Sequence, residues 1–116
     1  MGHDAEVVLA GLASCDTCRK ALRQLRESGR AARLRDLRSD PPDMAEARGW
    51  IARLGPAVLN TRSATWRGLD EEDRAGDPAT LLVRYPALVK RPLIEMPDGA
   101  LLLGWTPETR AALDLG

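Results

Sequence analysis

At 116 residues, with 44% apolar and 29% charged residues, the chain has the length and composition of one globular domain around a single core. Seventeen basic residues balance seventeen acidic ones, so the net charge gives no general attraction to nucleic acid. No segment approaches the roughly 18 consecutive apolar residues of a membrane-spanning helix, and the N-terminus lacks the features of a secretory signal. We therefore expect a cytoplasmic monomer without a membrane or direct nucleic-acid partner.

The first third of the chain predicts a strand, a helix and a second strand. Residues 6–10 form a short apolar run that ends at Gly11, as expected of a buried strand. From Asp16 to the Ser28-Gly29 stop, apolar residues recur at helical spacing: Cys18, Ala21, Leu22 and Leu25. Residues 32–37 alternate weakly, which favours a partly solvated strand. This order predicts a βαβ unit with parallel strands.

The middle of the chain is expected to be helical. Proline, glycine and capping residues mark three segments: a helix over 43–54, a short helix or structured loop over 60–69, and a helix over 77–86. On the first of these helices the expected apolar face comprises Met44, Ala47, Ile51 and Leu54. The last third predicts two strands, 93–96 and 100–103, and then a helix from Thr106 to about Leu115.

Both cysteines of the chain lie three positions apart in GLASCDTCRKAL. Cys15 is expected at the start of a helix, where unpaired N–H groups and the helix dipole favour a thiolate and lower its pKa from about 8.5. Cys18 follows one turn later, within reach of a mixed disulfide on Cys15. A CxxC motif between a strand and a helix of a βαβ unit is typical of a thioredoxin-like redox site. The intervening Asp16 and Thr17 are candidate substrate-binding residues.

A zinc site and simple packing are two other interpretations of the cysteines. Two cysteines supply only half of a tetrahedral zinc site, and the single histidine, His3, lies near the N-terminus. A metal would therefore have to be shared by a dimer, and we expect none. Simple packing fits Cys18, which lies on the apolar helix face, better than it fits Cys15.

Basic residues are concentrated next to the cysteines. Between Arg19 and Arg38, only Glu27 and Asp36 oppose eight cations: Arg19, Lys20, Arg23, Arg26, Arg30, Arg33, Arg35 and Arg38. The block is either a solvated face of the first helix and second strand, or a local positive field for anionic thiol substrates. It would also suit an interface with a protein partner.

A second motif, Lys90-Arg91-Pro92, directly precedes the predicted strand at Leu93. Proline cannot donate a hydrogen bond to a sheet, and a bend there, with a cis bond as one option, would turn the Arg91 backbone toward the first helix. The Arg91 guanidinium offers a bidentate fork to an oxyanion or carboxylate. The alternative is a solvated basic strand end.

Four motifs, ASCDTCRKAL, LNTRSATWRGL, YPALVKRPLI and ALLLGWTPE, occur in this order. With them the chain resembles the arsenate reductase-like family (ArsC/Spx/YffB) from about Val7 to Leu115. The resemblance implies an α/β, thioredoxin-like fold in one domain, residues 1–116. Its β-α-β and β-β-α halves would be separated by a helical insertion at about 41–86.

The resemblance also implies residue roles. Cys15 corresponds to the family's nucleophile, Arg62 and Arg91 to anion-binding arginines, and Pro92 to a cis-proline beside the active site. Lys90 belongs to a KRP variant found in branches that are not clearly arsenate reductases, and with Arg62, Arg91 and Pro92 it is a candidate substrate-binding residue.

The branches of the family imply different functions. LNTRSATWRGL, VKRPLI and LLLGW are most similar to the YffB branch, which implies reduction of thiols or mixed disulfides with glutathione as co-substrate and no bound cofactor. The CxxC motif is typical of the Spx branch, whose members sense oxidation and bind the RNA polymerase α subunit. Arsenate reductases have a histidine and a proline before the cysteine, and a third arginine after the last hairpin.

At these positions the chain has Leu12-Ala13-Ser14 and Gly104-Trp105. We therefore expect a glutathione-linked thiol–disulfide oxidoreductase that uses Cys15 as its nucleophile, with Cys18 or a second glutathione resolving the intermediate. A redox-sensing regulator that binds RNA polymerase is the alternative, and an arsenate reductase is a minor one.

Overall fold

A computed structural model describes residues 6–115. The chain divides into two compact units. The first, the sheet unit, contains the residues up to Asp36 together with those from Arg91 onward. The second, the helical unit, is Leu37–Lys90 and includes the predicted insertion of about residues 41–86. No helix in the described part of the chain is long and apolar enough to cross a membrane.

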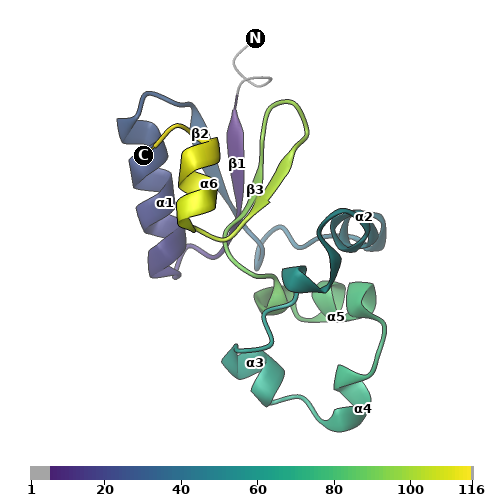
Figure 1. Cartoon of the computed structure of the whole chain (residues 1–116). Coiled ribbons are helices and arrows are strands. Elements are labelled where there is room, and N and C mark those ends of the chain that lie inside the picture. The colour runs from purple at the N-terminus through teal and green to yellow at the C-terminus, as the bar shows by residue number, and fades with distance from the viewer. Residues whose placement is uncertain (1–5, 116) are drawn as a thin grey trace. The chain divides into compact units, whose positions relative to one another are not determined.

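The sheet unit is built on four strands in the order β2-β1-β3-β4 (Figure 1). β1 (Val7–Gly11) pairs in parallel with β2 (Ala32–Asp36). On its other side it pairs antiparallel with β3 (Leu93–Glu95), which forms an antiparallel hairpin with β4 (Leu101–Leu103). The predicted parallel βαβ unit and the predicted C-terminal hairpin are both confirmed, with each strand shorter or shifted by one residue.

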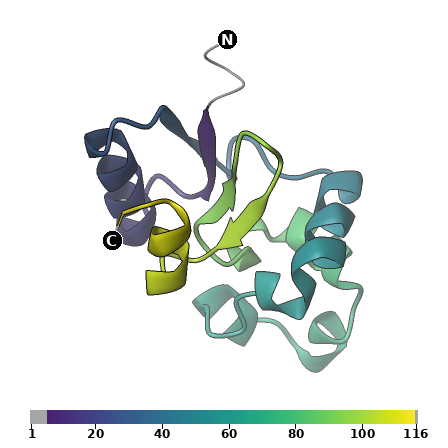
Figure 2. The same ribbon diagram turned by 45° about the horizontal axis from the view of Figure 1, so that its top comes forward.

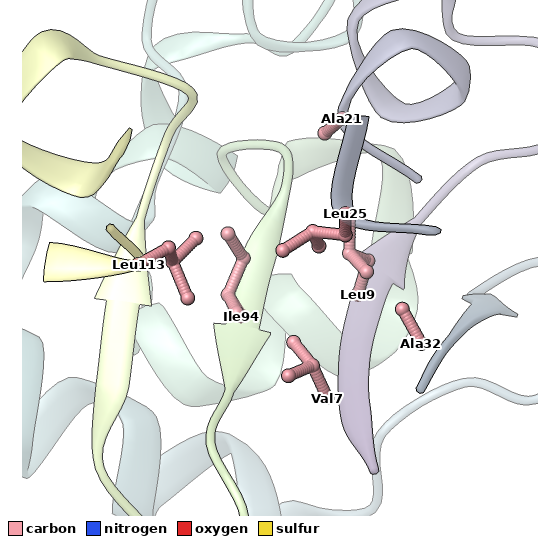
Figure 3. Close-up of a cluster of buried hydrophobic side chains, with 7 residues drawn as sticks. All are labelled: Val7, Leu9, Ala21, Leu25, Ala32, Ile94 and Leu113. Carbon is pink, nitrogen blue, oxygen red and sulfur yellow. The ribbon is translucent and has the colours of Figure 1, made fainter. Parts of the chain in front are cut away.

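Helices α1 (Asp16–Glu27) and α6 (Pro107–Ala112) lie next to each other on one face of this sheet (Figures 1 and 2). They cover a cluster of buried apolar side chains: Val7, Leu9, Ala21, Leu25, Ala32, Ile94 and Leu113. In Figure 3, Ile94 lies between Leu113 on one side and Leu9 and Leu25 on the other. The apolar spacing that predicted α1 therefore marks the helix face that meets the sheet.

Both helices are followed by a residue in the left-handed conformation. After α1, Gly29 adopts a positive φ of 91°, and the Arg30 N–H donates to the Leu25 carbonyl at 3.1 Å. After α6, Asp114 takes the left-handed position with φ 59°, and the Leu115 N–H donates to the Arg110 carbonyl at 2.8 Å. This closure ends α6 at Ala112, before the predicted end near Leu115, because Asp114 tolerates the left-handed conformation without being glycine.

The helical unit consists of short helices and two 3-10 turns: α2 (Met44–Leu54), η2 (Gly55–Val58), α3 (Ala64–Arg67), α4 (Glu71–Arg74), α5 (Pro78–Arg84) and η3 (Pro86–Leu88). α2, α3 and α5 fall in the segments predicted for them. α4 and the 3-10 turns were not predicted, because segments of three or four residues show no apolar period. Local caps mark them instead: the Asp70 carboxylate accepts the Asp73 N–H at the start of α4.

The buried face of α2 differs from the expected one. Ala47 and Trp50 are its buried residues, whereas Met44, Ile51 and Leu54 are only half-buried. The face is rotated because the large indole of Trp50, rather than the flanking aliphatic residues, fills the interior.

Candidate active site

Cys15 lies between β1 and α1, directly before the first residue of the helix. After the strand ends at Gly11, the chain turns through Leu12 and places Cys15 at the N-cap of α1, with its N–H donating to the Leu12 carbonyl at 3.0 Å. The backbone at Cys15 is extended (φ −86°, ψ 120°), and its carbonyl accepts the Arg19 N–H as the first bond of the helix. The Cys15 side chain is half-buried and its thiol is free.

Opposing effects act on the Cys15 thiol. Burial raises its pKa, but hydrogen bonds from the Cys18 N–H, the Cys18 thiol and the Thr17 N–H outweigh burial, with help from the positive charge of Arg91. The pKa of Cys15 therefore lies below its ordinary value. Unpaired N–H groups of the first helical turn are the main stabilising partners, as predicted for a cysteine at this end of a helix.

Cys18 has the opposite character. It is fully buried, and burial, together with its neighbour Cys15, raises its pKa to about 11. Its sulfur lies against the backbone of Gly11: a Cβ added there would overlap it. The Cys18 thiol thus stays protonated at neutral pH and donates its proton toward the Cys15 sulfur.

Arg91 and Pro92 border the same site. The Arg91–Pro92 bond is cis, as the resemblance predicted for Pro92. A Cβ on Gly11 would lie 3.8 Å from the Cβ of Arg91, so Arg91 and Cys18 both pack against that glycine. Pro92 is buried, and its carbonyl accepts the Gly104 N–H at 2.9 Å. Arg91 is therefore the cation that the sheet unit places beside the two thiols.

The residues between the cysteines have distinct environments. Thr17 contributes its backbone N–H to the Cys15 sulfur, whereas the exposed Asp16 carboxylate forms an ion pair with Arg19. A substrate-binding role for either side chain stays a prediction.

Two residues of the site were not singled out from the sequence. The Asp36 carboxylate accepts the Ala13 N–H at 3.0 Å, and Arg19 donates to the Ala13 carbonyl at 3.1 Å. In the sequence, both residues stand out only as charges of the segment 19–38. The predicted strand order does indicate Asp36: it lies near the end of a strand predicted over 32–37 to run parallel to the one before Gly11, and the ends of parallel strands share one edge of the sheet.

The other two predicted cations, Arg62 and Lys90, come together in the helical unit. They line an open cavity of about 620 Å³, whose other lining residues are Pro56, Ala57, Leu59, Asn60 and Thr61. An isolated bridge between Leu59 and Val89 joins the two segments that carry the cations.

Hydrogen bonds strengthen this junction. The Lys90 N–H donates to the Val58 carbonyl and the Asn60 N–H to the Leu88 carbonyl, each at 2.8 Å. The Asn60 side chain also accepts the Arg62 N–H at 3.1 Å. The result is a cavity lined by two cations and by apolar residues.

After the last hairpin, the position of a third cation is taken by Gly104 and Trp105. Gly104 has a positive φ of 79°, and the half-buried Trp105 packs against the core cluster and donates from its indole N–H to the Gln24 side chain at 2.9 Å. Trp105 thus links the segment before α6 to α1 through this hydrogen bond, and it adds no charge to the site.

A metal site is not apparent among residues 6–115: they contain no group of three or more His, Cys, Asp and Glu side chains able to hold an ion. His3, the histidine considered for zinc, lies outside the described residues.

Known proteins resemble this chain along most of its length. An uncharacterized protein of Haemophilus influenzae is 36% identical over 104 residues, which are 85% of this chain and 90% of the relative. A solved structure described as YffB protein is 34% identical with a TM-score of 0.82, over 91% of this chain and 96% of that one. An arsenate reductase (ArsC) related protein from Brucella melitensis is 29% identical with a TM-score of 0.72, over 92% of each chain.

These structures confirm the thioredoxin-like α/β fold that the resemblance implied. The ArsC family itself matches residues 11–113, a range that includes both cysteines and the three cations predicted to bind substrate, Arg62, Lys90 and Arg91. The chain therefore belongs to the ArsC family, and this membership supports a thiol-based redox function.

Proposed function

We propose that this protein is a glutathione-linked thiol–disulfide oxidoreductase in which Cys15 is the nucleophile. The asymmetry of the two thiols carries the proposal. Cys15 is partly exposed with a lowered pKa, while Cys18 is buried with a pKa raised to about 11. Only a thiolate attacks a disulfide at a useful rate, so Cys15 is the thiol able to start the reaction at neutral pH.

In the first step, the Cys15 thiolate attacks the glutathione sulfur of a mixed disulfide between glutathione and a substrate thiol. A new bond forms between the Cys15 sulfur and glutathione, the substrate's S–S bond breaks, and the substrate leaves as a thiolate that takes up a proton from water. The hydrogen bonds that stabilise the Cys15 thiolate before attack also make it a good leaving group afterwards.

In the second step, the thiolate of a free glutathione attacks the glutathione sulfur bound to Cys15. Oxidised glutathione forms and the Cys15 thiolate is released, so overall one substrate disulfide is reduced and one glutathione disulfide is made. We assign this step to glutathione rather than Cys18, because burial is the largest cause of the raised Cys18 pKa and persists in the intermediate. Cys18 then serves as a hydrogen-bond donor to Cys15.

Substrate recognition is assigned to the cations. Arg91, beside the thiols, has the geometry to bind a carboxylate. In the helical unit, the pocket lined by Arg62 and Lys90 has the positive charge to bind an acidic group as well. Glutathione is a peptide with two carboxylates, so it carries the kind of group that each of these cations can bind.

One observation favours a redox-sensing alternative. The thiols of Cys15 and Cys18 are hydrogen-bonded to each other. If an oxidant converted Cys15 to a sulfenic acid, the Cys18 thiol would therefore be close enough to condense with it, forming a disulfide and releasing water. A regulator of this type would show little turnover and would bind a partner in a redox-dependent way, with RNA polymerase as the candidate.

The test is steady-state reduction of a glutathione mixed disulfide, with glutathione as reductant and glutathione reductase as the coupling enzyme. Wild type, Cys15→Ser and Cys18→Ser are compared. We expect turnover in wild type and Cys18→Ser and none in Cys15→Ser.

Other results would revise the proposal in defined ways. Turnover lost in both variants would show a dithiol mechanism. Absence of turnover in wild type, with a Cys15–Cys18 disulfide forming under oxidant, would favour the sensor. Arsenate-dependent oxidation of glutathione that requires Cys15 would instead indicate an arsenate reductase.

A further inference from the structure

The loop of residues 12–14, between β1 and α1, is held from both sides by charged side chains. The Ala13 N–H donates to the Asp36 carboxylate at 3.0 Å, and the Ala13 carbonyl accepts from the Arg19 guanidinium at 3.1 Å. Arg19 in turn forms an ion pair with Asp16 in the first turn of α1. Ala13 itself is exposed, so its backbone is fixed by these two bonds and not by burial.

The neighbouring residue, Leu12, contacts both cysteines. Its carbonyl accepts the Cys15 N–H at 3.0 Å, and its N–H forms a hydrogen bond to the Cys18 thiol. Because Leu12 and Ala13 share a peptide bond, whatever holds Ala13 also sets the position of the Leu12 carbonyl and hence the N-cap conformation of Cys15.

The topology explains how a residue so distant in sequence reaches this loop. β1 and β2 are parallel, and their last residues, Gly11 and Asp36, are partners in the register. The side chain at the end of β2 therefore lies beside the loop that leaves β1. Arg19 approaches from the opposite side because it lies one helical turn beyond Cys15 on α1.

We propose that Asp36 and Arg19 are positioning residues that clamp the Ala13 peptide and so keep Cys15 in the helix-capping conformation its reactivity requires. The inference deepens the proposed function and rests on its premise that Cys15 is the reactive thiol. It does not depend on which disulfide is the substrate.

If the Asp36 carboxylate is removed, the clamp and a direct effect of its charge predict opposite changes in the Cys15 pKa. The groups that act on the Cys15 thiol are the N–H groups of Thr17 and Cys18, the Cys18 thiol and the positive charge of Arg91. The charges of Asp36 and Arg19 meet the loop at Ala13, and Asp16 pairs with Arg19. If Asp36 acted through its negative charge, removing the charge would favour the thiolate and lower the Cys15 pKa. If it acts by holding Ala13, losing the acceptor releases the loop and raises that pKa.

The experiment measures the rate of alkylation of Cys15 by iodoacetamide between pH 5 and 9 in the full chain, with mass spectrometry to confirm the modified residue. Asp36→Ala removes the acceptor, whereas Asp36→Asn keeps an acceptor oxygen and removes the charge. The matched control is Asp98→Ala, because Asp98 accepts the Ala100 N–H at 2.9 Å in the hairpin turn and has no part in the cysteine loop.

We expect Asp36→Ala to raise the apparent pKa of Cys15, with a rate about three to ten times slower at the acidic end of the profile, where the thiolate fraction limits the rate. Asp36→Asn and Asp98→Ala should follow the wild-type profile. An unchanged or lowered pKa in Asp36→Ala, or the same shift in Asp36→Asn, would overturn the clamp.

A second variant covers the case in which Asp36→Ala does not fold, as judged by circular dichroism. Arg19→Lys keeps the positive charge but loses the fork that reaches Ala13 and Asp16 together, and it should also raise the Cys15 pKa; a wild-type profile would refute the clamp. The mixed-disulfide assay separates the two proposals: no wild-type turnover with the expected pH shifts would refute the proposed function alone.

Discussion

The two units of this protein hold their functional groups by different means. In the sheet unit, the thiols lie at the junction of a strand and a twelve-residue helix, where the backbone N–H groups of the first turn act directly on Cys15. In the helical unit, Arg62 and Lys90 project from irregular segments joined by one isolated bridge and a few backbone hydrogen bonds. In the sheet unit the regular helix start lowers the pKa of Cys15, whereas in the helical unit irregular segments carry the cations of the pocket.

The candidate functional residues of the two units also differ in how deeply they are buried. Cys18 and its contact, Gly11, are buried, and Cys15 is half-buried, whereas Arg62 and Lys90 are exposed. A buried thiol responds to small changes in packing and local dielectric, while an exposed cation in water mainly affects how tightly an anion binds. Substitutions in the two units should therefore change different measurable quantities.

The largest expected effect concerns selectivity between the two thiols. With a pKa of about 11, only about one Cys18 in ten thousand is a thiolate at pH 7, and that one is buried. In the native protein, iodoacetamide should therefore modify Cys15 alone, and Cys15→Ser should abolish labelling until the chain is unfolded. Modification of native Cys18 at a comparable rate, detected by mass spectrometry, would remove the contrast between the thiols.

A second prediction separates the cations from the thiols. Arg62→Ala and Lys90→Ala should each raise the KM for an anionic disulfide substrate about tenfold or more, as expected for the loss of a charge-assisted hydrogen bond. Neither should change the pH profile of Cys15 alkylation. Arg84→Ala, an exposed arginine outside the pocket, is the matched control. An unchanged KM in both pocket variants would show that the cavity does not bind substrate.

A third prediction tests the packing of Cys18 on Gly11. Gly11→Ala should lower the free energy of unfolding by about 1–3 kcal/mol, because the new methyl group would overlap the Cys18 sulfur. Cys18→Ala in the same chain should restore much of this loss. Urea unfolding of the two single variants and the double variant measures the coupling between them. Purely additive effects would mean that the two residues do not press on each other.

The smallest effect is a pH dependence of stability. Because the pKa of Cys18 is raised on folding, the folded state keeps its proton between about pH 8.5 and 11 while the unfolded state has lost it. Stability should therefore fall with rising pH in this window, by at most about 1.4 kcal/mol per pH unit from this group.

Comparison with Cys18→Ala isolates this contribution from other groups that titrate in the same window. The lowered pKa of Cys15 acts in the opposite sense, since it adds stability above its folded-state value that is lost as the pH falls through it. An identical slope in wild type and Cys18→Ala would contradict the burial-based account of Cys18.

The βαβ half of the sheet unit could be predicted because its strands and its helix are long enough to show an apolar run or a period. The i, i+3, i+4, i+7 spacing of α1 and the apolar run of β1 indicated both the elements and the buried face. The helical unit was harder. α4 spans only four residues, and on α2 helical spacing from Ala47 allows either Trp50 at i+3 or Ile51 at i+4 to be buried. Motif resemblance identified Arg62 and Lys90, but spacing could not have paired them.

By itself, the sequence indicated Cys15 as the candidate nucleophile, its place at the start of a helix and the family to which the chain belongs, because each of these is read from short segments of the chain. Only the tertiary structure decided how that cysteine is controlled. Burial raises the Cys18 pKa, Gly11 gives the Cys18 sulfur its space, and Asp36 reaches the loop from the neighbouring parallel strand. These effects depend on which segments pack together, and packing brings into contact residues whose separation along the chain carries no signal.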